Sequence, residues 1–148
     1  MPRVICFCKS GGLILLCVAC CLLGLSGCAQ PSDPVSPVGD SAETYNQQGV
    51  ELYAQGDFDG AIAKYDKAIE LDPSFSTAYF NRGLAYCKNG EHTKAINDYT
   101  KAISLRPNYP EAYNNRGFSY FKLDNFDQAL ENYNKALDLA HTIIDTSK

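Results

Sequence analysis

Hydrophobic and polar residues follow three different patterns along this chain of 148 residues. Residues 11–25 are continuously apolar, and residues 30–41 are mostly polar and contain three prolines. From residue 42 onward, apolar residues recur at helical spacing, in blocks that alternate with short polar turns. This arrangement predicts a helical body preceded by an apolar segment and an extended connection, because closely spaced prolines prevent helices and buried strands.

The helical body repeats at an interval of 34 residues, and each repeat contains two helical blocks. Each repeat is therefore predicted to be a helical hairpin, over residues 42–75, 76–109 and 110–143, with a tail at 144–148. Small residues let two helix backbones approach closely, and aromatic rings fill the gaps that remain. The residues that return in register are Tyr45, Tyr79 and Tyr113; Gly49, Gly83 and Gly117; Ala61, Ala95 and Ala129; Tyr65, Tyr99 and Tyr133; and Ala68, Ala102 and Ala136.

The third repeat departs from the first two at its helix ends. Gly56 and Gly90 separate the two blocks of the first and second repeats, where a helix ends in a left-handed conformation, and Asp124 stands at this position in the third. Asp tolerates this conformation better than most residues with side chains, so the turn is expected to form. His141 replaces the proline that closes the earlier repeats, and the last helix is expected to continue through Ile143.

These positions resemble the motif of the tetratricopeptide repeat, over about residues 42–143. The resemblance implies an all-α fold in which three tandem hairpins form a short right-handed superhelical solenoid. It also implies a concave groove that binds a protein or peptide, and hence a non-catalytic adaptor for protein–protein interaction. One alternative is a self-associating scaffold or homo-oligomer, because the last repeat, with Ile143 and Ile144, has no polar cap. Another is an accessory to an enzyme whose chemistry lies in a partner.

The family's groove positions predict which residues contact the partner. Amide groups beside aromatic rings suit an extended peptide, because amides bond its backbone while the rings bury its side chains. For Leu84 and Phe118, packing between helices is the alternative. The predicted groove residues are Asn46, Gln47, Val50 and Tyr53 in the first repeat, Phe80, Asn81, Leu84, Cys87 and Lys88 in the second, and Asn114, Asn115, Phe118, Phe121 and Lys122 in the third.

Chaperone-binding members of this family hold an acidic chain terminus in a clamp of Lys, Asn and Arg side chains. The resemblance places the clamp positions at Asn46, Val50, Asn81, Glu111 and Asn115, and only Asn81 matches. This sequence is therefore expected to bind its partner in a different way.

Residues 1–27 have the three parts of a secretory signal: Arg3 and Lys9, the apolar segment 11–25, and small residues before Cys28. The apolar segment of 15 residues spans roughly 22 Å, short of the ~30 Å that a membrane-spanning helix fills. The sequence Leu-Ser-Gly-Cys that ends at Cys28 resembles the lipobox of bacterial lipoproteins. The resemblance implies that Cys28 receives a diacylglycerol and an amino-terminal acyl chain such as palmitate, and becomes the first residue of the mature protein.

Lipid on Cys28 would attach the protein to a membrane, because two or more acyl chains are enough for stable anchoring. Residues 28–41 would then form a linker rich in Pro and Ser, of which residues 30–41 reach up to roughly 37 Å. We expect a protein anchored by lipid to the cell membrane or outer membrane, facing the periplasm or the cell exterior. The alternatives are an uncleaved anchor and an ordinary signal cleaved after Ala29, which would release a soluble exported protein.

Charge and cysteine content argue against a disulfide-stabilised domain and against a nucleic-acid-binding protein. Six of the seven cysteines lie in the first 28 residues, so no disulfide framework is expected in the helical body. Without residues 1–27, which hold two basic residues and no acid, the formal charge changes from −4 to −6. The body has no basic stripe, so nucleic acid is not an expected partner.

No catalytic site, metal or cofactor is expected. His92 and His141 lack a nearby nucleophile pattern, and the spacings typical of zinc and calcium ligands are missing from the sequence. Cys87 is expected to pack as a small apolar residue, with a redox role or intermolecular pairing as the alternative. Arg82 and Arg116 either stack on neighbouring tyrosines or pair with acids of the adjacent helix, and the sequence leaves this choice open.

Overall fold

The computed structural model of the chain describes residues 41–145, with side chains as far as Thr142. The predicted signal segment, Cys28 and residues 29–40 of the linker lie outside the described residues. The described part consists of six helices, which are α1 (Ala42–Ala54), α2 (Phe58–Leu71), α3 (Ser76–Lys88), α4 (His92–Leu105), α5 (Pro110–Lys122) and α6 (Phe126–Asp145).

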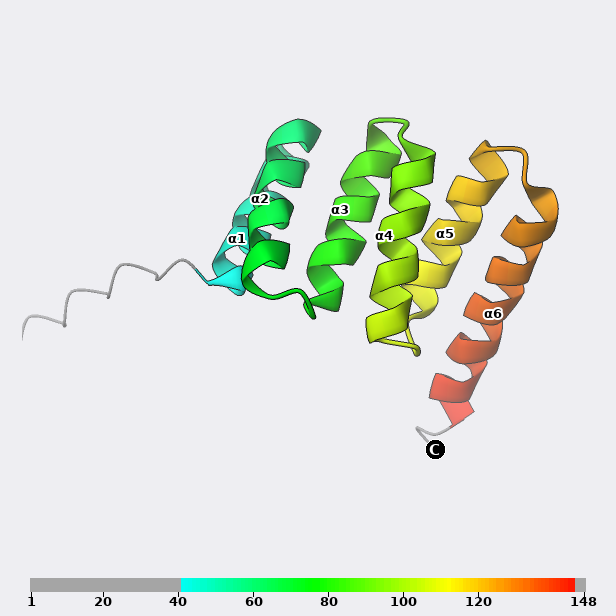
Figure 1. Cartoon of the computed structure of the whole chain (residues 1–148). Coiled ribbons are helices and arrows are strands. Elements are labelled where there is room, and N and C mark those ends of the chain that lie inside the picture. Colours follow the sequence, from blue (N-terminus) through cyan, green and yellow to red (C-terminus); the bar gives the residue numbers. More distant parts are fainter. Residues whose placement is uncertain (1–40, 146–148) are drawn as a thin grey trace, which may run out of the picture. The chain divides into compact units, whose positions relative to one another are not determined.

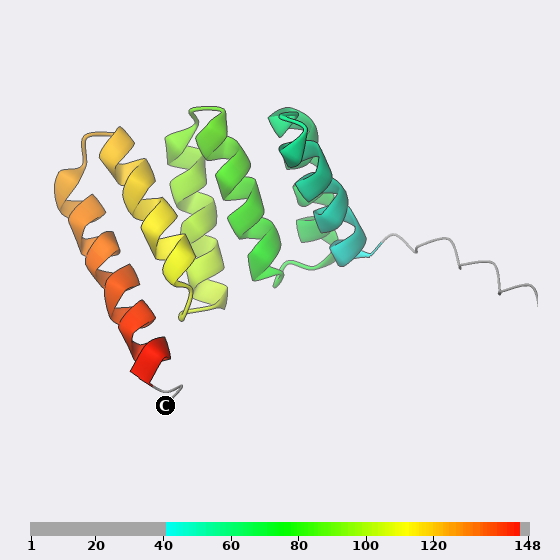
Figure 2. The same cartoon turned by 180° about the vertical axis from the view of Figure 1, so that it is seen from behind.

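The helices form three hairpins, α1–α2, α3–α4 and α5–α6, which stand side by side in a row (Figures 1 and 2). Each helix packs on the next along the chain, and α3 also contacts both α1 and α5. The first helices of successive hairpins therefore lie next to one another. The predicted all-α fold of three helical hairpins is confirmed.

The turns inside the hairpins have the predicted backbone conformation. Gly56 and Gly90 have φ angles of +84° and +79°, and Asp124 has a φ of 59°. The next helix then starts with a cap in the first hairpin, where the Asp57 carboxylate accepts a hydrogen bond of 2.9 Å from the amide of Gly60. The last helix, α6, continues to Asp145, as expected for a repeat without a closing proline.

Each hairpin is closed by a tyrosine ring that packs on a glycine of the facing helix. An added Cβ atom would lie 2.5 Å from a ring carbon at Gly49, 2.7 Å at Gly83 and 3.0 Å at Gly117. The rings belong to Tyr65, Tyr99 and Tyr133, and the first two are at most 1% exposed. The glycine and tyrosine of the 34-residue register thus hold the two helices of each hairpin together.

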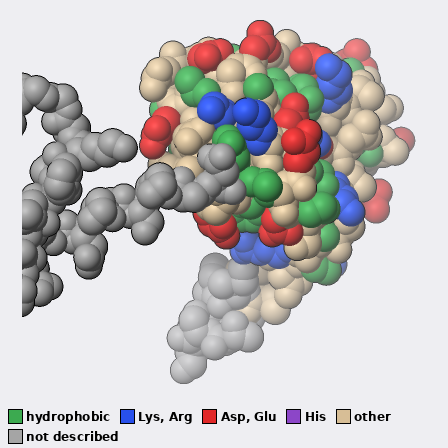
Figure 3. Space-filling model, turned by 60° about the vertical axis from the view of Figure 1, so that its left-hand side comes forward, with side chains coloured by type: hydrophobic (Ala, Val, Ile, Leu, Met, Phe, Trp, Pro, Cys, Tyr) green, Lys and Arg blue, Asp and Glu red, His purple; other side chains and the backbone are tan. Residues whose placement is uncertain are grey.

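The surface is mixed in charge. On the face shown in Figure 3, acidic and basic side chains are interspersed among apolar and neutral ones. Among the described helices, none combines the length and apolar character needed to cross a bilayer.

Candidate partner-binding pocket

A pocket of about 620 Å³ lies along the first helices of the three hairpins. Its walls come from α1, α3 and α5, with one residue each from α4 and α6. We call it the A-helix pocket. Its lining residues are Tyr53, Leu84, Cys87, Lys88, His92, Asn114, Asn115, Phe118, Lys122 and Tyr133.

Most of the predicted groove residues of the second and third repeats lie in this pocket, and Tyr53 represents the first repeat. Sequence reasoning missed His92 and Tyr133, which come from the second helices of their hairpins. Tyr133 could have been found from the register, because it packs on Gly117 of the neighbouring helix. His92 has no comparable signal. That these residues contact a partner stays a prediction.

Phe80 and Asn81 lie between repeats and not in the pocket. The ring centroid of Phe80 is 4.9 Å from that of Tyr109 and 5.8 Å from that of Tyr99. The side-chain amide of Asn81 donates a hydrogen bond of 2.9 Å to the Oδ1 atom of Asn46 on α1. Phe80 also packs against a cluster that includes Ala112 of α5. Both side chains therefore join neighbouring repeats, which is a structural role that the groove positions alone did not indicate.

The remaining predicted groove residues are exposed outside the pocket. Gln47 and Val50 lie on α1, and the Val50 side chain is 38% exposed. Phe121 is 49% exposed, and its ring packs edge-on against Phe126 across the last turn, at a centroid distance of 5.7 Å.

The A-helix pocket is cationic although the helical body carries an excess of acid. Its charged lining residues are Lys88 and Lys122, and none of its lining residues is acidic. The Nζ atom of Lys122 lies 5.3 Å from the centroid of the Phe118 ring, and His92 meets the same ring edge-on at 6.3 Å. An apolar ring surrounded by positive charge and amides can hold acidic and apolar groups of a polypeptide.

Cys87 lies partly buried at the floor of this pocket. Its Sγ atom is 3.8 Å from Nδ1 of His92, and the Ser119 hydroxyl donates a hydrogen bond to it over 4.0 Å. Burial, and then the nearby Cys87, raise the pKa of the Tyr53 phenol. No group of three or more His, Cys, Asp and Glu side chains in the described part of the chain could hold a metal ion.

The two arginines of the NRG triplets behave differently. Arg82 donates to Asp98 from Nε and Nη2 over 2.8 and 2.6 Å, and to Asp66 from Nη1 over 2.6 Å. The hydrogen bond to Asp98 is the main cause that raises the pKa of Arg82. Arg82 also lies over tyrosine rings of its own helix, so both predicted interactions occur. Arg116 lies over the ring of Tyr113, but among the described residues no acid forms an ion pair with it.

Comparison with known proteins agrees with this geometry. A family model described as "TPR repeat" matches residues 49–90 and 83–124, and one described as "Tetratricopeptide repeat" matches residues 110–142. The crystal structure of MamA is 33% identical with a TM-score of 0.70, over 72% of this chain and 62% of its own. A second MamA structure is matched over 58% of its length, so this chain spans about three fifths of these relatives.

Two further similar structures are complexes. The first TPR of Spaghetti (RPAP3), bound to the HSP90 peptide SRMEEVD, is 31% identical with a TM-score of 0.65, over 66% of this chain and 78% of its own. The TPR2B domain of yeast Sti1, in a complex with pHsp70, is 27% identical with a TM-score of 0.68, over 72% and 85%. The three hairpins, their glycine–tyrosine contacts and these matches show that the chain belongs to the tetratricopeptide repeat family.

Proposed function

We propose that this chain is a non-catalytic adaptor that binds a segment of another protein in the A-helix pocket, at the cell envelope. The main support for this function is the lining of the pocket, in which Phe118 and Tyr53 lie among amides and lysines and no acid is present. Aromatic faces bury apolar side chains, and the amides of Asn114 and Asn115 can bond a peptide backbone.

The solved relatives support a polypeptide as the partner, since the RPAP3 repeats were determined with the HSP90 peptide SRMEEVD. The mode of binding proposed here differs from a clamp on a chain terminus. Asn46 and Asn81 are bonded to one another, and Glu111 places an acid where the clamp requires a base. The positive charge of the A-helix pocket comes instead from Lys88 and Lys122, which favour acidic side chains within a segment.

Crosslinking in intact envelopes, followed by capture of the full chain, tests this site. A variant with Asn114→Ala, Phe118→Ala and Lys122→Ala should lose the partner that the native protein captures. The matched control is Leu71→Ala, Asn97→Ala and Lys101→Ala, which changes similar kinds of side chain at exposed positions outside the pocket and away from the exposed apolar residues of α6. Equal capture by native protein and pocket variant would show that the pocket is not the site.

The proposal includes a lipid anchor on Cys28, which rests on the lipobox resemblance of the sequence. The mature protein is expected to start at Cys28 and to carry acyl chains. The Cys28→Ala variant should therefore no longer be found in the membrane fraction. Mass spectrometry of the mature protein identifies its first residue and any acyl chains attached to it. An unmodified polypeptide that starts at Gln30 would instead indicate a soluble exported protein.

Self-association is the second candidate, and one observation favours it. Phe126, Leu130 and Leu137 on α6 are 58%, 61% and 58% exposed. Large apolar side chains at the end of a repeat stack are commonly covered by a further element or by another chain. A symmetric contact through α6 would make the protein a scaffold and leave the A-helix pocket open.

A further inference from the structure

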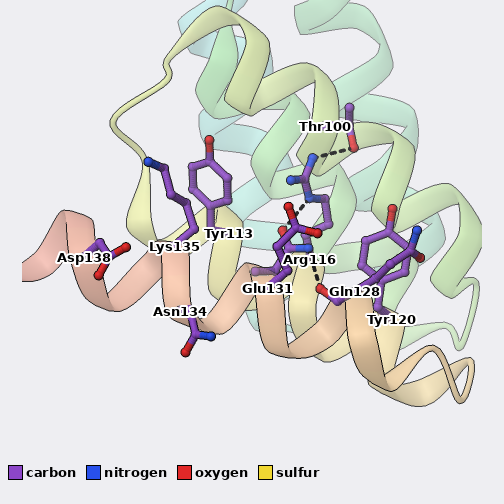
Figure 4. A pocket seen from close by; sticks show the side chains of 10 residues that line it. Thr100, Tyr113, Arg116, Tyr120, Gln128, Glu131, Asn134, Lys135 and Asp138 are labelled. Carbon is purple, nitrogen blue, oxygen red and sulfur yellow. Dashed lines mark hydrogen bonds between the residues drawn. The ribbon is translucent and has the colours of Figure 1, made fainter.

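We propose that a second pocket, built around Arg116, binds a carboxylate. The pocket has a volume of about 640 Å³ and lies between α4 and α6, over α5 (Figure 4). Tyr113, Arg116 and Tyr120 enter it from one face of α5, whereas the A-helix pocket uses Asn114, Phe118 and other residues on the opposite face. We call it the Arg116 pocket. Its lining residues are Thr100, Tyr113, Arg116, Tyr120, Gln128, Glu131, Asn132, Asn134, Lys135 and Asp138.

The preceding repeat shows what an arginine at this position binds. Arg82 lies 34 residues before Arg116, and its guanidinium is held by the carboxylates of Asp98 and Asp66. These two acids satisfy the donors at all three nitrogens and neutralise the charge. Around Arg82, the first repeat (Asp66) and the second repeat (Asp98) therefore supply carboxylates of the protein itself, at the site where we propose an external one beside Arg116.

Neutral residues stand at both of these acid positions around Arg116. Asn132 stands at the position of Asp98, and Thr100 at that of Asp66. The Nε atom of Arg116 donates to Oδ1 of Asn132 over 2.8 Å, and Nη1 donates to Oγ1 of Thr100 over 3.0 Å. Neither of these two partners carries a charge, so the hydrogen bonds of Arg116 within the described part of the chain include none to a carboxylate.

The geometry leaves one side of the guanidinium available. Nη2 of Arg116 has no hydrogen bond to any residue that the structure describes. Asn132 is 5% exposed, and its own amide nitrogen donates to the carbonyl of Gln128 over 2.7 Å, which fixes its oxygen toward the arginine. The guanidinium carbon lies 5.3 Å from the centroid of the Tyr113 ring, whose face attracts a cation. A planar carboxylate matches the Nη1 and Nη2 edge, and the Thr100 hydroxyl can turn to donate to it.

No acid of this pocket forms an ion pair with Arg116. Glu131, Lys135 and Asp138 also line it, and none of the described acids lies within ion-pair distance of the arginine. Figure 4 shows Lys135 and Asp138 farther along α6, beyond Tyr113. A partly buried guanidinium that lacks an anionic partner is a favourable place for a carboxylate. This ligand is either an acidic side chain of a polypeptide or a free carboxylate.

Two substitutions test the site in the full-length chain in detergent. Arg116→Gln removes the donors, and Asn132→Asp supplies an internal carboxylate while it keeps the arginine, as the native second repeat does. The probes are succinate and the peptide acetyl-Gly-Glu-Gly-amide, with acetyl-Gly-Gln-Gly-amide as the neutral control. The side-chain Nε–H resonance of Arg116 reports binding in the native and Asn132→Asp proteins, and calorimetry compares all variants.

We expect at least one acidic probe to shift the Arg116 resonance saturably, and both substitutions to weaken binding by about tenfold or more. Asn108→Asp adds the same charge in an exposed turn outside the pocket and should bind as the native protein does. The tighter probe identifies the source of the carboxylate. Binding at Lys88 or Lys122 in the A-helix pocket would survive both substitutions. The proposal is overturned if neither acidic probe shifts the resonance, or if Asn132→Asp binds as tightly as the native protein.

Discussion

Glycine and tyrosine act together at the residue scale in each hairpin of this protein. The ring of Tyr65 lies so close to Gly49 that a Cβ atom there would be 2.5 Å from Cε1. Tyr65 is 1% exposed, so its ring is enclosed by other parts of the protein. The periodicity predicted that these positions face one another, and the contact explains why each requires its residue type.

Gly49→Ala is therefore expected to destabilise the protein, although alanine is the better helix former. Overpacking of a filled core costs about 1–3 kcal/mol, which exceeds the gain in helix propensity of about 1 kcal/mol. Chemical denaturation should show a net loss of about 1 kcal/mol in the free energy of unfolding. In a Tyr65→Ala background, where the ring is gone, the same substitution should have no cost. Native-like stability of the single variant would contradict the packing argument.

Burial of Tyr65 predicts a dependence of stability on alkaline pH. Burial raises the pKa of its phenol from 10.0 to about 12, because the folded state disfavours the charged form. Between these values the unfolded chain releases the proton and the folded protein retains it. The free energy of unfolding should thus be constant just below pH 10 and fall as the pH rises from 10 to 12.

Denaturant unfolding across this range measures the effect, and Tyr65→Phe is the control because it removes the titrating group. The loss should be smaller in Tyr65→Phe than in the native protein. A remaining loss is expected, since burial also raises the pKa of Tyr99. Equal pH dependence in both proteins would show that Tyr65 does not titrate as described.

At the scale of the element, all three hairpin turns contain a residue with a left-handed backbone conformation, but the type of residue differs. Two turns use glycine with a positive φ, and the third uses Asp124 with a φ of 59°. This conformation raises the free energy of a residue with a side chain by about 1–2 kcal/mol, and by somewhat less when the residue is Asp. The α5–α6 turn is therefore formed at a cost that the other two turns do not carry.

Asp124→Gly should stabilise the protein by roughly 0.5–1 kcal/mol, since relief of the left-handed backbone exceeds the added entropy of the unfolded chain. Gly90→Asp, which transfers the same residue into the second turn, should destabilise it by a similar amount. Thermal or chemical unfolding of the Asp124→Gly and Gly90→Asp variants measures these changes in stability. Two changes of the same sign would show that the φ angle is not the cause.

At the scale of the whole molecule, the stack has one end with large exposed apolar side chains on α6. Leu130 and Leu137 are 61% and 58% exposed, and they lie seven residues apart on the same face of the helix. Large exposed apolar surfaces on a folded domain favour association.

If α6 mediates self-association, sedimentation of the full chain should show a size that increases with concentration. The Leu130→Gln and Leu137→Gln double variant should then be monomeric, with the A-helix pocket intact. Gln47→Ala with Val50→Ala, at exposed positions of α1, is the control and should associate like the native protein. A native monomer at every concentration would exclude the scaffold.

At the candidate site, the sequence predicted which residues lie on one face of a helix but not all of the contacts that their side chains make. Groove positions of the family led to Asn114, Phe118 and Lys122, which do line one pocket. The same reasoning placed Phe80 in the groove, which stays a prediction, but it did not indicate that the ring centroid of Phe80 lies 4.9 Å from that of Tyr109. A position in one helix predicts the direction of a side chain, but its surroundings depend on the neighbouring repeat.

The sequence by itself determined the six helices, their pairing into hairpins and the left-handed turn at Asp124, because these follow from local periodicity and from backbone preferences of single residues. Only the tertiary structure decided that His92 joins the A-helix pocket and that Arg82 is neutralised while Arg116 is not. These outcomes depend on distances between side chains of different helices, and the packing of the hairpins sets those distances.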